Sequence, residues 1–210
     1  AWVSQTPVLS YWSTSAALSD KSIYPNFART VPPDSLNAFA MTNILAEMGW
    51  TSFSVLFLND LYGVGYSQDL ASAAGAVGLT VATAQKYTSG DTDSIQRAVE
   101  TIKNAGVRIV VCIAFSSDMD EILQSSAEMG TSERGWIWVT GDAISNPEFL
   151  IEISTAPNRT LQQLNGWLQV QPSAFAGGNG KRFQDAWSSE PTENLNHSLL
   201  NSFAPTADLQ

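Results

Sequence analysis

The sequence has little of the chemistry on which enzymes depend. It holds one cysteine, Cys112, and one histidine, His197, so no internal disulfide can form. His197 lies in a polar C-terminal tail, which leaves a catalytic triad without its base. A metal site likewise lacks a set of His and Cys ligands. These absences predict a protein that is not an enzyme and uses no cofactor.

Positive charge and long apolar runs are also scarce. The chain has 10 Lys and Arg residues against 20 Asp and Glu residues, a formal net charge of −10, and no basic run. Nucleic acid and anionic membrane surfaces both need clustered Lys and Arg, so neither is an expected partner. The longest apolar run, Val107 to Phe115, has only the length of a strand. We therefore expect any membrane anchor to lie outside this sequence, and no signal peptide opens it at Ala1.

Two signals for the cellular compartment oppose each other. A lone cysteine is typical of a reducing compartment. The sequons Asn158-Arg159-Thr160 and Asn196-His197-Ser198 are typical of a secreted chain. We take Asn158 and Asn196 as predicted glycosylation sites and expect an extracellular location.

A repeated unit of strand and helix organises the middle of the chain. With 44% apolar and 14% charged residues, the composition allows a packed core. Short apolar runs of the kind found in strands buried on both faces recur at spacings of 27, 28 and 29 residues. They begin at Ser52, Leu79, Val107 and Trp136. Because this spacing suits right-handed β-α-β crossovers, we predict an α/β fold with a three-layer, doubly wound parallel sheet.

Helix signals separate these strands. We expect Asp34 to cap the first helix and Gly49 to end it, and Asp118 to cap a later helix that ends at Gly130. An Ala- and Gly-rich helix is expected over 67–78. The predicted apolar stripes are Met41, Ile44, Leu45 and Met48 in the first helix, and Ile95, Val99 and Ile102 in a helix that ends at Gly106.

The two ends of the chain differ from the middle. Residues 1–33 contain one predicted strand, 7–11, then a Ser/Thr-rich turn and an extended stretch punctuated by proline. Residues 171–210 contain one amphipathic helix near 181–187 and then a polar tail. Neither end is long enough to form a compact lobe by itself.

Glycine-rich and acidic motifs have simpler explanations than nucleotide or calcium binding. Gly63-Val64-Gly65 lacks the third glycine of a dinucleotide loop, because the required position holds Gln68, and we interpret it as a loop where a ligand meets the main chain. Gly178-Asn179-Gly180-Lys181 is followed by Arg182, where a P-loop needs Ser or Thr. Cys112 is interpreted as a small buried apolar residue. Acids that complement helix dipoles are Asp91, Asp93, Asp118, Asp120 and Glu121.

Polar side chains follow the predicted strands at several places, each in a different loop. Ligands of open α/β sheets bind at the carboxyl ends of the strands, so these side chains could meet in one site. The predicted ligand-binding residues are Ser13, Thr14, Asp34, Tyr62, Ser116 and Asp142.

Ordered motifs over roughly residues 5–187 resemble the ligand-binding ectodomains of class C receptors, most closely those of the metabotropic glutamate type. The wider family has the type I periplasmic-binding-protein fold and also covers natriuretic-peptide-type receptors. The motifs are SYWSTSAALSDK from Ser10, YPNFARTVPPD from Tyr24, the helix ending Met48-Gly49-Trp50, LYGVG from Leu61, and TGD from Thr140.

The resemblance implies a hinged, venus-flytrap domain with one complete lobe and a partial second lobe. Residues 34–170 would be the complete lobe, and residues 1–33 and 171–210 would belong to the other lobe. A ligand that contacts both lobes would favour the closed state. Such receptors are commonly dimers, so a homo- or heterodimer is expected in the full receptor.

The resemblance also gives the predicted site a role. In amino-acid-sensing members, the positions matching Thr14, Asp34, Tyr62 and Asp142 hold the α-ammonium group of the ligand. Carboxylates, a hydroxyl and an aromatic face can replace the hydration shell of an ammonium ion. Trp12 stands where glutamate receptors have a serine that helps to hold the ligand's carboxylate. The resemblance therefore implies a ligand that bears an amine, and leaves open GABA, another amino acid or a different amine.

Several alternatives remain at this point. The chain could be a soluble bacterial-type amino-acid binding protein that serves a transporter, or the ectodomain of a guanylate-cyclase-type receptor. Flanking sequence would separate these from a class C receptor. An enzyme on the same fold would show turnover of candidate ligands, and a truncated product without folded activity would aggregate through uncovered apolar surface.

Overall fold

The computed structural model describes residues 6–144, 147–172 and 177–189. The chain divides into two compact units, 1–172 and 173–210. The first contains a five-stranded sheet in the order β4-β3-β5-β6-β7, and every neighbouring pair is parallel. Its strands are β3 (Ser52–Leu58), β4 (Thr80–Tyr87), β5 (Ile109–Ile113), β6 (Ile137–Thr140) and β7 (Leu168–Gln169). The predicted parallel α/β fold is confirmed.

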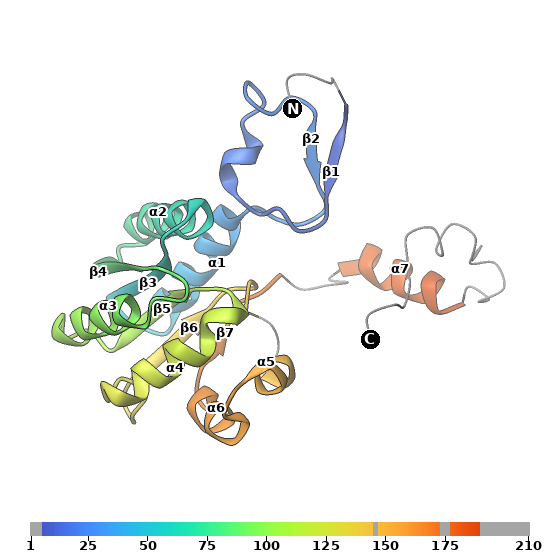
Figure 1. The fold of residues 1–210 in the computed structure, drawn as a ribbon. Coiled ribbons are helices and arrows are strands. Elements are labelled where there is room, and N and C mark those ends of the chain that lie inside the picture. The colour runs from blue at the N-terminus through green and yellow to red at the C-terminus, as the bar shows by residue number, and fades with distance from the viewer. Residues whose placement is uncertain (1–5, 145–146, 173–176, 190–210) are drawn as a thin grey trace. The chain divides into compact units, whose positions relative to one another are not determined.

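Helices cover both faces of this sheet (Figure 1). One face carries α1 (Asp34–Glu47) and α2 (Leu61–Ala76), and the other carries α3 (Thr92–Asn104) and α4 (Met119–Glu128). The connection from β6 to β7 contains α5 (Pro147–Ile153) and α6 (Pro157–Leu164). The second unit contains α7 (Gly177–Ser189), at the place where the sequence predicts an amphipathic helix.

The core is divided by the sheet into two layers. Along β5, Val111 and Ile113 pack on the side of α1 and α2, whereas Val110 and Cys112 pack on the side of α3 and α4. This alternation follows from the two-residue period of a strand. Cys112 is fully buried, which confirms its interpretation as a core residue, and burial raises the pKa of its thiol.

A short strand pair precedes the first helix. β1 (Val8–Ser10) and β2 (Phe27–Arg29) are parallel, and the 3-10 helix η1 (Ala16–Ser19) lies between them in the chain. β2 falls in the stretch that the sequence indicated only as extended. The segment meets α1 through the backbone, where Asp34 N donates to Thr14 O at 2.9 Å. This contact brings the Ser/Thr-rich turn to the start of α1.

Two acids predicted as helix caps make no capping hydrogen bond, for the same physical reason. Pro33 precedes α1, and Asp34 is the first helical residue without a capping bond from its side chain. Asp118 precedes α4 and also makes no capping bond. Its carboxylate instead accepts from Tyr87 Oη at 2.9 Å and from Ser89 Oγ at 2.5 Å. Both acids face tertiary surroundings rather than the helix end, and a sequence pattern of caps does not show such surroundings.

Two further expectations are corrected by packing. The buried face of α1 includes Met41 and Leu45, but Ile44 and Met48 are 37% and 49% exposed, so only half of the predicted stripe lies in the core. Residues 63–65 belong to the first turns of α2 rather than to a loop, because α2 begins at Leu61. The helix-ending glycines at 49, 106 and 130 do have the positive φ expected of them.

Candidate functional site

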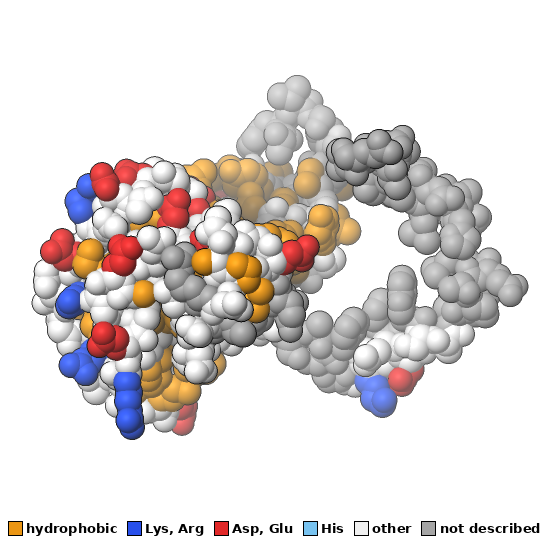
Figure 2. All heavy atoms as spheres, turned by 60° about the horizontal axis from the view of Figure 1, so that its bottom comes forward, with side chains coloured by type: hydrophobic (Ala, Val, Ile, Leu, Met, Phe, Trp, Pro, Cys, Tyr) orange, Lys and Arg blue, Asp and Glu red, His pale blue; other side chains and the backbone are white. Residues whose placement is uncertain are grey.

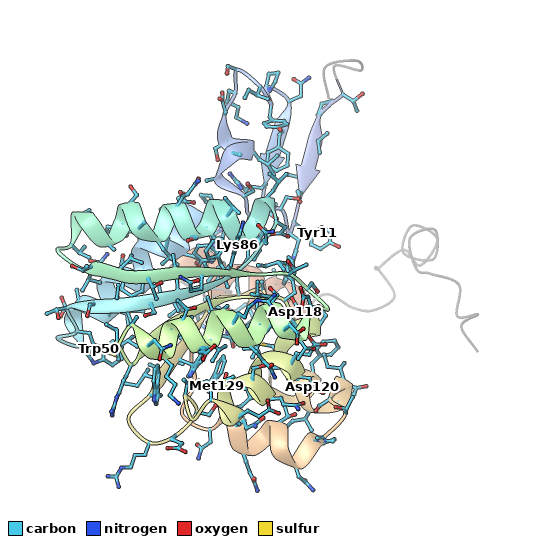
Figure 3. All side chains as sticks on the ribbon, turned by 60° about the vertical axis from the view of Figure 1, so that its left-hand side comes forward. Tyr11, Trp50, Lys86, Asp118, Asp120 and Met129 are labelled. Atoms are coloured by element: carbon cyan, nitrogen blue, oxygen red, sulfur yellow. The ribbon has the colours of Figure 1, made fainter. Side chains whose placement is uncertain are left out.

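The carboxyl edge of the sheet has the topology of a ligand-binding crevice. The chain passes from β3 outward to β4 and then back across to β5, so β3 and β5 mark the point where the strand order reverses. Loops after adjacent strands on either side of such a point leave a crevice between them. In the view of Figure 3, Tyr11 and Asp118 lie at this end of the unit, and Trp50 lies at the opposite end.

The crevice contains a cavity of about 360 Å³ between the Ser/Thr-rich turn and the ends of three strands. Four of the predicted residues, Ser13, Thr14, Tyr62 and Asp142, line it together. The remaining lining residues are Trp12, Ser15, Leu18, Asp60, Leu61, Phe115 and Ala143. The volume suits a small molecule such as an amino acid or an amine.

A second cavity of about 550 Å³ adjoins the first and shares Ser15, Leu18, Leu61 and Tyr62 with it. Asp34 lines this second cavity. The predicted residues Ser13, Thr14, Asp34, Tyr62 and Asp142 therefore lie along two adjoining cavities. The sequence reasoning thus placed five of its six residues at one edge of the sheet.

Asp34 is a buried carboxylate that lacks a full set of partners. Its side chain is 2% exposed, and its Oδ1 accepts no hydrogen bond within the described part of the chain. Burial raises its pKa from 3.8 to about 6; Asp142 and Asp69 add to the increase, while the Thr14 hydroxyl and Arg29 oppose it. An incoming cation would relieve both the lost hydration and the repulsion between carboxylates.

Asp142 is held by a residue that the sequence reasoning missed. Asn37 Nδ2 donates to Asp142 Oδ1 at 3.2 Å, which links α1 to the loop after β6. Asn37 lies three residues after Asp34, so both side chains share the inner face of α1. That i, i+3 spacing from a predicted ligand residue is a signal that could have identified it.

Aromatic rings form one wall of the site. Tyr62 stacks on Phe115 with ring centroids 5.1 Å apart and meets Tyr66 edge-on at 5.8 Å. Burial, followed by Tyr66 and the carboxylates of Asp34 and Asp142, raises the pKa of Tyr62, so its phenol keeps its proton near neutral pH. The buried Tyr66 hydroxyl has no hydrogen-bond partner among the described residues. The wall therefore offers a phenol donor and aromatic faces to a ligand.

Arg29 holds the Ser/Thr-rich turn in place. Its Nη1 donates to Ser13 O at 3.1 Å and to Ser15 O at 2.9 Å, and its Nη2 donates to Ser19 Oγ. The guanidinium thus ties β2 to the turn that carries Thr14. Arg29 therefore stabilises the turn, and it lines neither cavity.

Ser116 does not lie with the other predicted residues. It lines a small cavity of about 30 Å³ near the N-terminus of α4, together with Asp120 and Thr160. The preceding residue, Phe115, lines the main cavity instead. Ser116 was predicted because its hydroxyl can form hydrogen bonds. At the end of β5 it is the ring of Phe115, stacked on Tyr62, that lines the main cavity.

The predicted glycosylation sites have different standing. Asn158 is exposed in the first turn of α6. Asn196 lies outside the residues that the structure describes. Within the described ranges there is no group of three or more His, Cys, Asp or Glu residues that could hold a metal ion, and no helix there is long and apolar enough to cross a membrane. On the face drawn in Figure 2, the Lys and Arg side chains are separate rather than clustered.

A protein-family model described as "Receptor family ligand binding region" matches residues 2–206. Metabotropic glutamate receptor-like protein E from Dictyostelium discoideum is 28% identical over 165 residues, which are 72% of this chain and 20% of that protein. The extracellular calcium-sensing receptors of Mus musculus and Bos taurus are each 25% identical over 148 residues, 68% of this chain and 14% of each receptor. The chain thus spans about a fifth or less of the length of these relatives.

Proposed function

The chain belongs to the family of receptor ligand-binding regions, and from this premise we propose that it is part of the extracellular domain of a cell-surface receptor that senses an amino acid or a related small amine. The similarity to a metabotropic glutamate receptor-like protein and to calcium-sensing receptors supports a class C-like receptor. Membrane attachment and signal output would then depend on other parts of the receptor. The ligand would act by favouring a closed, hinged state.

One observation carries the amine part of the proposal. Asp34 and Asp142 come from different elements and lie beside the aromatic wall of the same crevice, and the charge of Asp142 adds to the raised pKa of Asp34. A primary ammonium can donate three hydrogen bonds and carries the charge that two carboxylates need. The orphaned Oδ1 of Asp34 and the face of Tyr62 supply an acceptor and a cation–π contact for the same group.

A soluble binding protein that serves a transporter would use the same chemistry. The relatives that match the chain are named as receptors, which favours the receptor. Enzymatic turnover is not part of the proposal, since the family is one of ligand binding. Dimer formation is proposed for the full receptor, in keeping with the expectation from sequence.

The test is titration calorimetry of amines and amino acids against the chain and three isosteric variants. Asp142→Asn and Asp34→Asn should each weaken the binding of an amine by roughly 2–5 kcal/mol, because each removes one charge partner from a partly buried pair. Asp93→Asn, at an exposed position in the first turn of α3, is the matched control for the change in net charge. It should leave the affinity unchanged.

Two outcomes would contradict the proposal. Affinity that is unchanged in both Asp142→Asn and Asp34→Asn would remove these residues from the site. Calcium is titrated alongside, because two of the relatives are named calcium-sensing receptors and a carboxylate pair also attracts a divalent ion. If calcium binds and no amine does, the proposed ligand is wrong and the site is one for a metal ion.

A further inference from the structure

The main cavity also carries information about the rest of the ligand. We infer that the ligand joins its ammonium group to an uncharged, apolar body, best an aromatic one, and carries no acidic side chain. This inference rests on the proposed function, because it assumes that the ammonium group lies at Asp142 and Asp34. It concerns the apolar side chains that line the same cavity.

Three large apolar side chains of this lining are open to solvent. Trp12, Leu61 and Phe115 line the cavity and are 65%, 92% and 38% exposed. Large apolar side chains that converge on a cavity while remaining exposed are surface that a ligand can bury. Phe115 already stacks on Tyr62, and a further ring can pack against Phe115. Trp12 comes from the Ser/Thr-rich turn and lines the same cavity, so it can also contact that ring.

The charges around the cavity oppose an acidic ligand. Asp60 and Asp142 line the same cavity, and Asp34 lines the adjoining one. No Lys or Arg lines either cavity within the described residues. Arg29, the cation whose charge reaches Asp34, donates to the Ser13 and Ser15 carbonyls. A carboxylate on the ligand's side chain would therefore add a negative charge beside several others without a counter-ion.

The turn itself is also internally satisfied. Ser13 N donates to Ser10 Oγ at 2.9 Å, and the Ser10 and Ser13 hydroxyls lie 2.8 Å apart in a hydrogen bond. These groups are engaged with each other rather than directed at a second anion. The carboxylates of the lining thus suit a cation, and its exposed apolar side chains suit an apolar body.

The experiment compares four probes on the full chain by titration calorimetry: 2-phenylethylamine, ethylamine, L-phenylalanine and L-glutamate. 2-Phenylethylamine should bind about tenfold or more tightly than ethylamine, and L-phenylalanine about tenfold or more tightly than L-glutamate, which has the same α-carboxylate, since only the aromatic member of each pair buries several methylene equivalents of apolar surface. Trp12→Ser should remove most of this difference by weakening the aromatic probes alone. Tyr11→Ser is the matched control, because Tyr11 precedes Trp12, is 78% exposed and does not line the cavity (Figure 3).

The outcomes separate this inference from the proposed function. If no amine binds, the proposed function fails and the inference fails with it. If amines bind but L-glutamate binds as tightly as L-phenylalanine, the proposed function stands and the inference is wrong. The inference is also overturned if Trp12→Ser weakens ethylamine and 2-phenylethylamine by the same factor, or if it acts no differently from Tyr11→Ser.

Discussion

At the scale of single residues, the buried carboxylate of Asp34 lowers the stability of the fold at the place where we propose a binding site. Burial, with Asp142 and Asp69 nearby, raises its pKa to about 6 from the ordinary 3.8. Between these two values the folded chain holds a proton that the unfolded chain has released. The free energy of unfolding therefore falls as pH rises through this window, and the ionised Asp34 lowers stability by roughly 3 kcal/mol at most above it.

This sign yields a prediction in which stability and binding change in opposite directions. In urea unfolding, the difference in free energy of unfolding between Asp34→Asn and the parent chain should grow by about 1–3 kcal/mol in favour of the variant from about pH 4.5 to about pH 7.5. Over the same range the affinity of the parent chain for an amine should rise, because the ionised form is the one that attracts a cation. Taking the difference removes the contributions of other acids, and Asp93→Asn should show no such growth. A difference that does not grow between the two pH values would show that ionisation of Asp34 does not lower stability.

The residues of the candidate site fall into two groups, those that the sequence predicted and those that it did not. Thr14, Tyr62 and Asp142 follow from the rule that ligands meet the carboxyl ends of parallel strands, together with the motifs that resemble class C receptors. Phe115 and Asn37 were missed because their roles depend on contacts across the fold. The stacking of Phe115 on Tyr62 and the hydrogen bond from Asn37 to Asp142 join elements far apart in sequence.

At the scale of helices and strands, the spacing of the apolar runs predicted the structure better than the expected N-cap residues did. The intervals between apolar runs gave the strands, because buried parallel strands need continuous apolar sequence. The inner face of α1 was only half predicted, because it also buries Asp34, Asn37 and Thr42. A pattern of apolar residues does not show that the buried face of a helix also contains polar residues. Which side of α1 is covered depends on its packing against α2.

The turn from β3 into α2 is the element that fixes Tyr62, and it depends on one glycine. A Cβ on Gly63 would lie 2.0 Å from the carbonyl oxygen of Leu58, and the same backbone region holds Asp60, whose Oδ1 accepts from Gly63 N at 2.7 Å. Only a residue without a side chain allows the helix to start this close to the strand. Gly63 is therefore required for packing, a role that the dinucleotide-loop comparison did not suggest.

Alanine substitutions at two glycines of α2 should then have opposite effects. Gly63→Ala should lower the free energy of unfolding by about 3 kcal/mol or more, since a backbone atom must move to admit the methyl group. Gly75→Ala lies on the exposed side of the same helix with nothing within 4 Å of its Cβ, and should raise stability by up to about 1 kcal/mol through helix propensity. Urea unfolding measures both, and equal effects of the two changes would contradict the packing argument.

At the scale of the whole molecule, the chain matches its family model over nearly its full length but matches only a small part of each relative. The family model covers residues 2–206, whereas the chain spans only 14–20% of the relatives that match it. The boundary between compact units after Pro172 lies near the predicted exit from the complete lobe. The assignment of residues 1–33 and 171–210 to a second lobe stays a prediction.

The predicted glycosylation at Asn158 can be tested within this chain. Its side chain is exposed, but the Thr160 hydroxyl of the same sequon is buried, donates to Ala156 O at 3.2 Å and hydrogen-bonds Asp120 Oδ1 at 3.2 Å. An attached sugar would extend into solvent, yet the folded sequon hides the hydroxyl that an N-glycosylating enzyme must reach. We therefore expect a glycan at Asn158 to be added before α6 packs against α4.

Secretion of the chain from a eukaryotic cell should then give a product whose mass falls on treatment with an N-glycosidase. Because Asn196 is a second predicted site, Asn158→Gln should reduce that change in mass by one glycan, without loss of stability, since the side chain of Asn158 is exposed. Thr160→Ala should give the same reduction, but with a loss of about 1–2 kcal/mol in the free energy of unfolding, since Asp120 loses a buried partner. Asp120→Asn weakens the same packing and keeps the sequon, so its glycan occupancy should equal or exceed that of the parent chain. A secreted product in which Asn158 carries no sugar, in the parent and in Asp120→Asn alike, would refute the predicted glycosylation at this position.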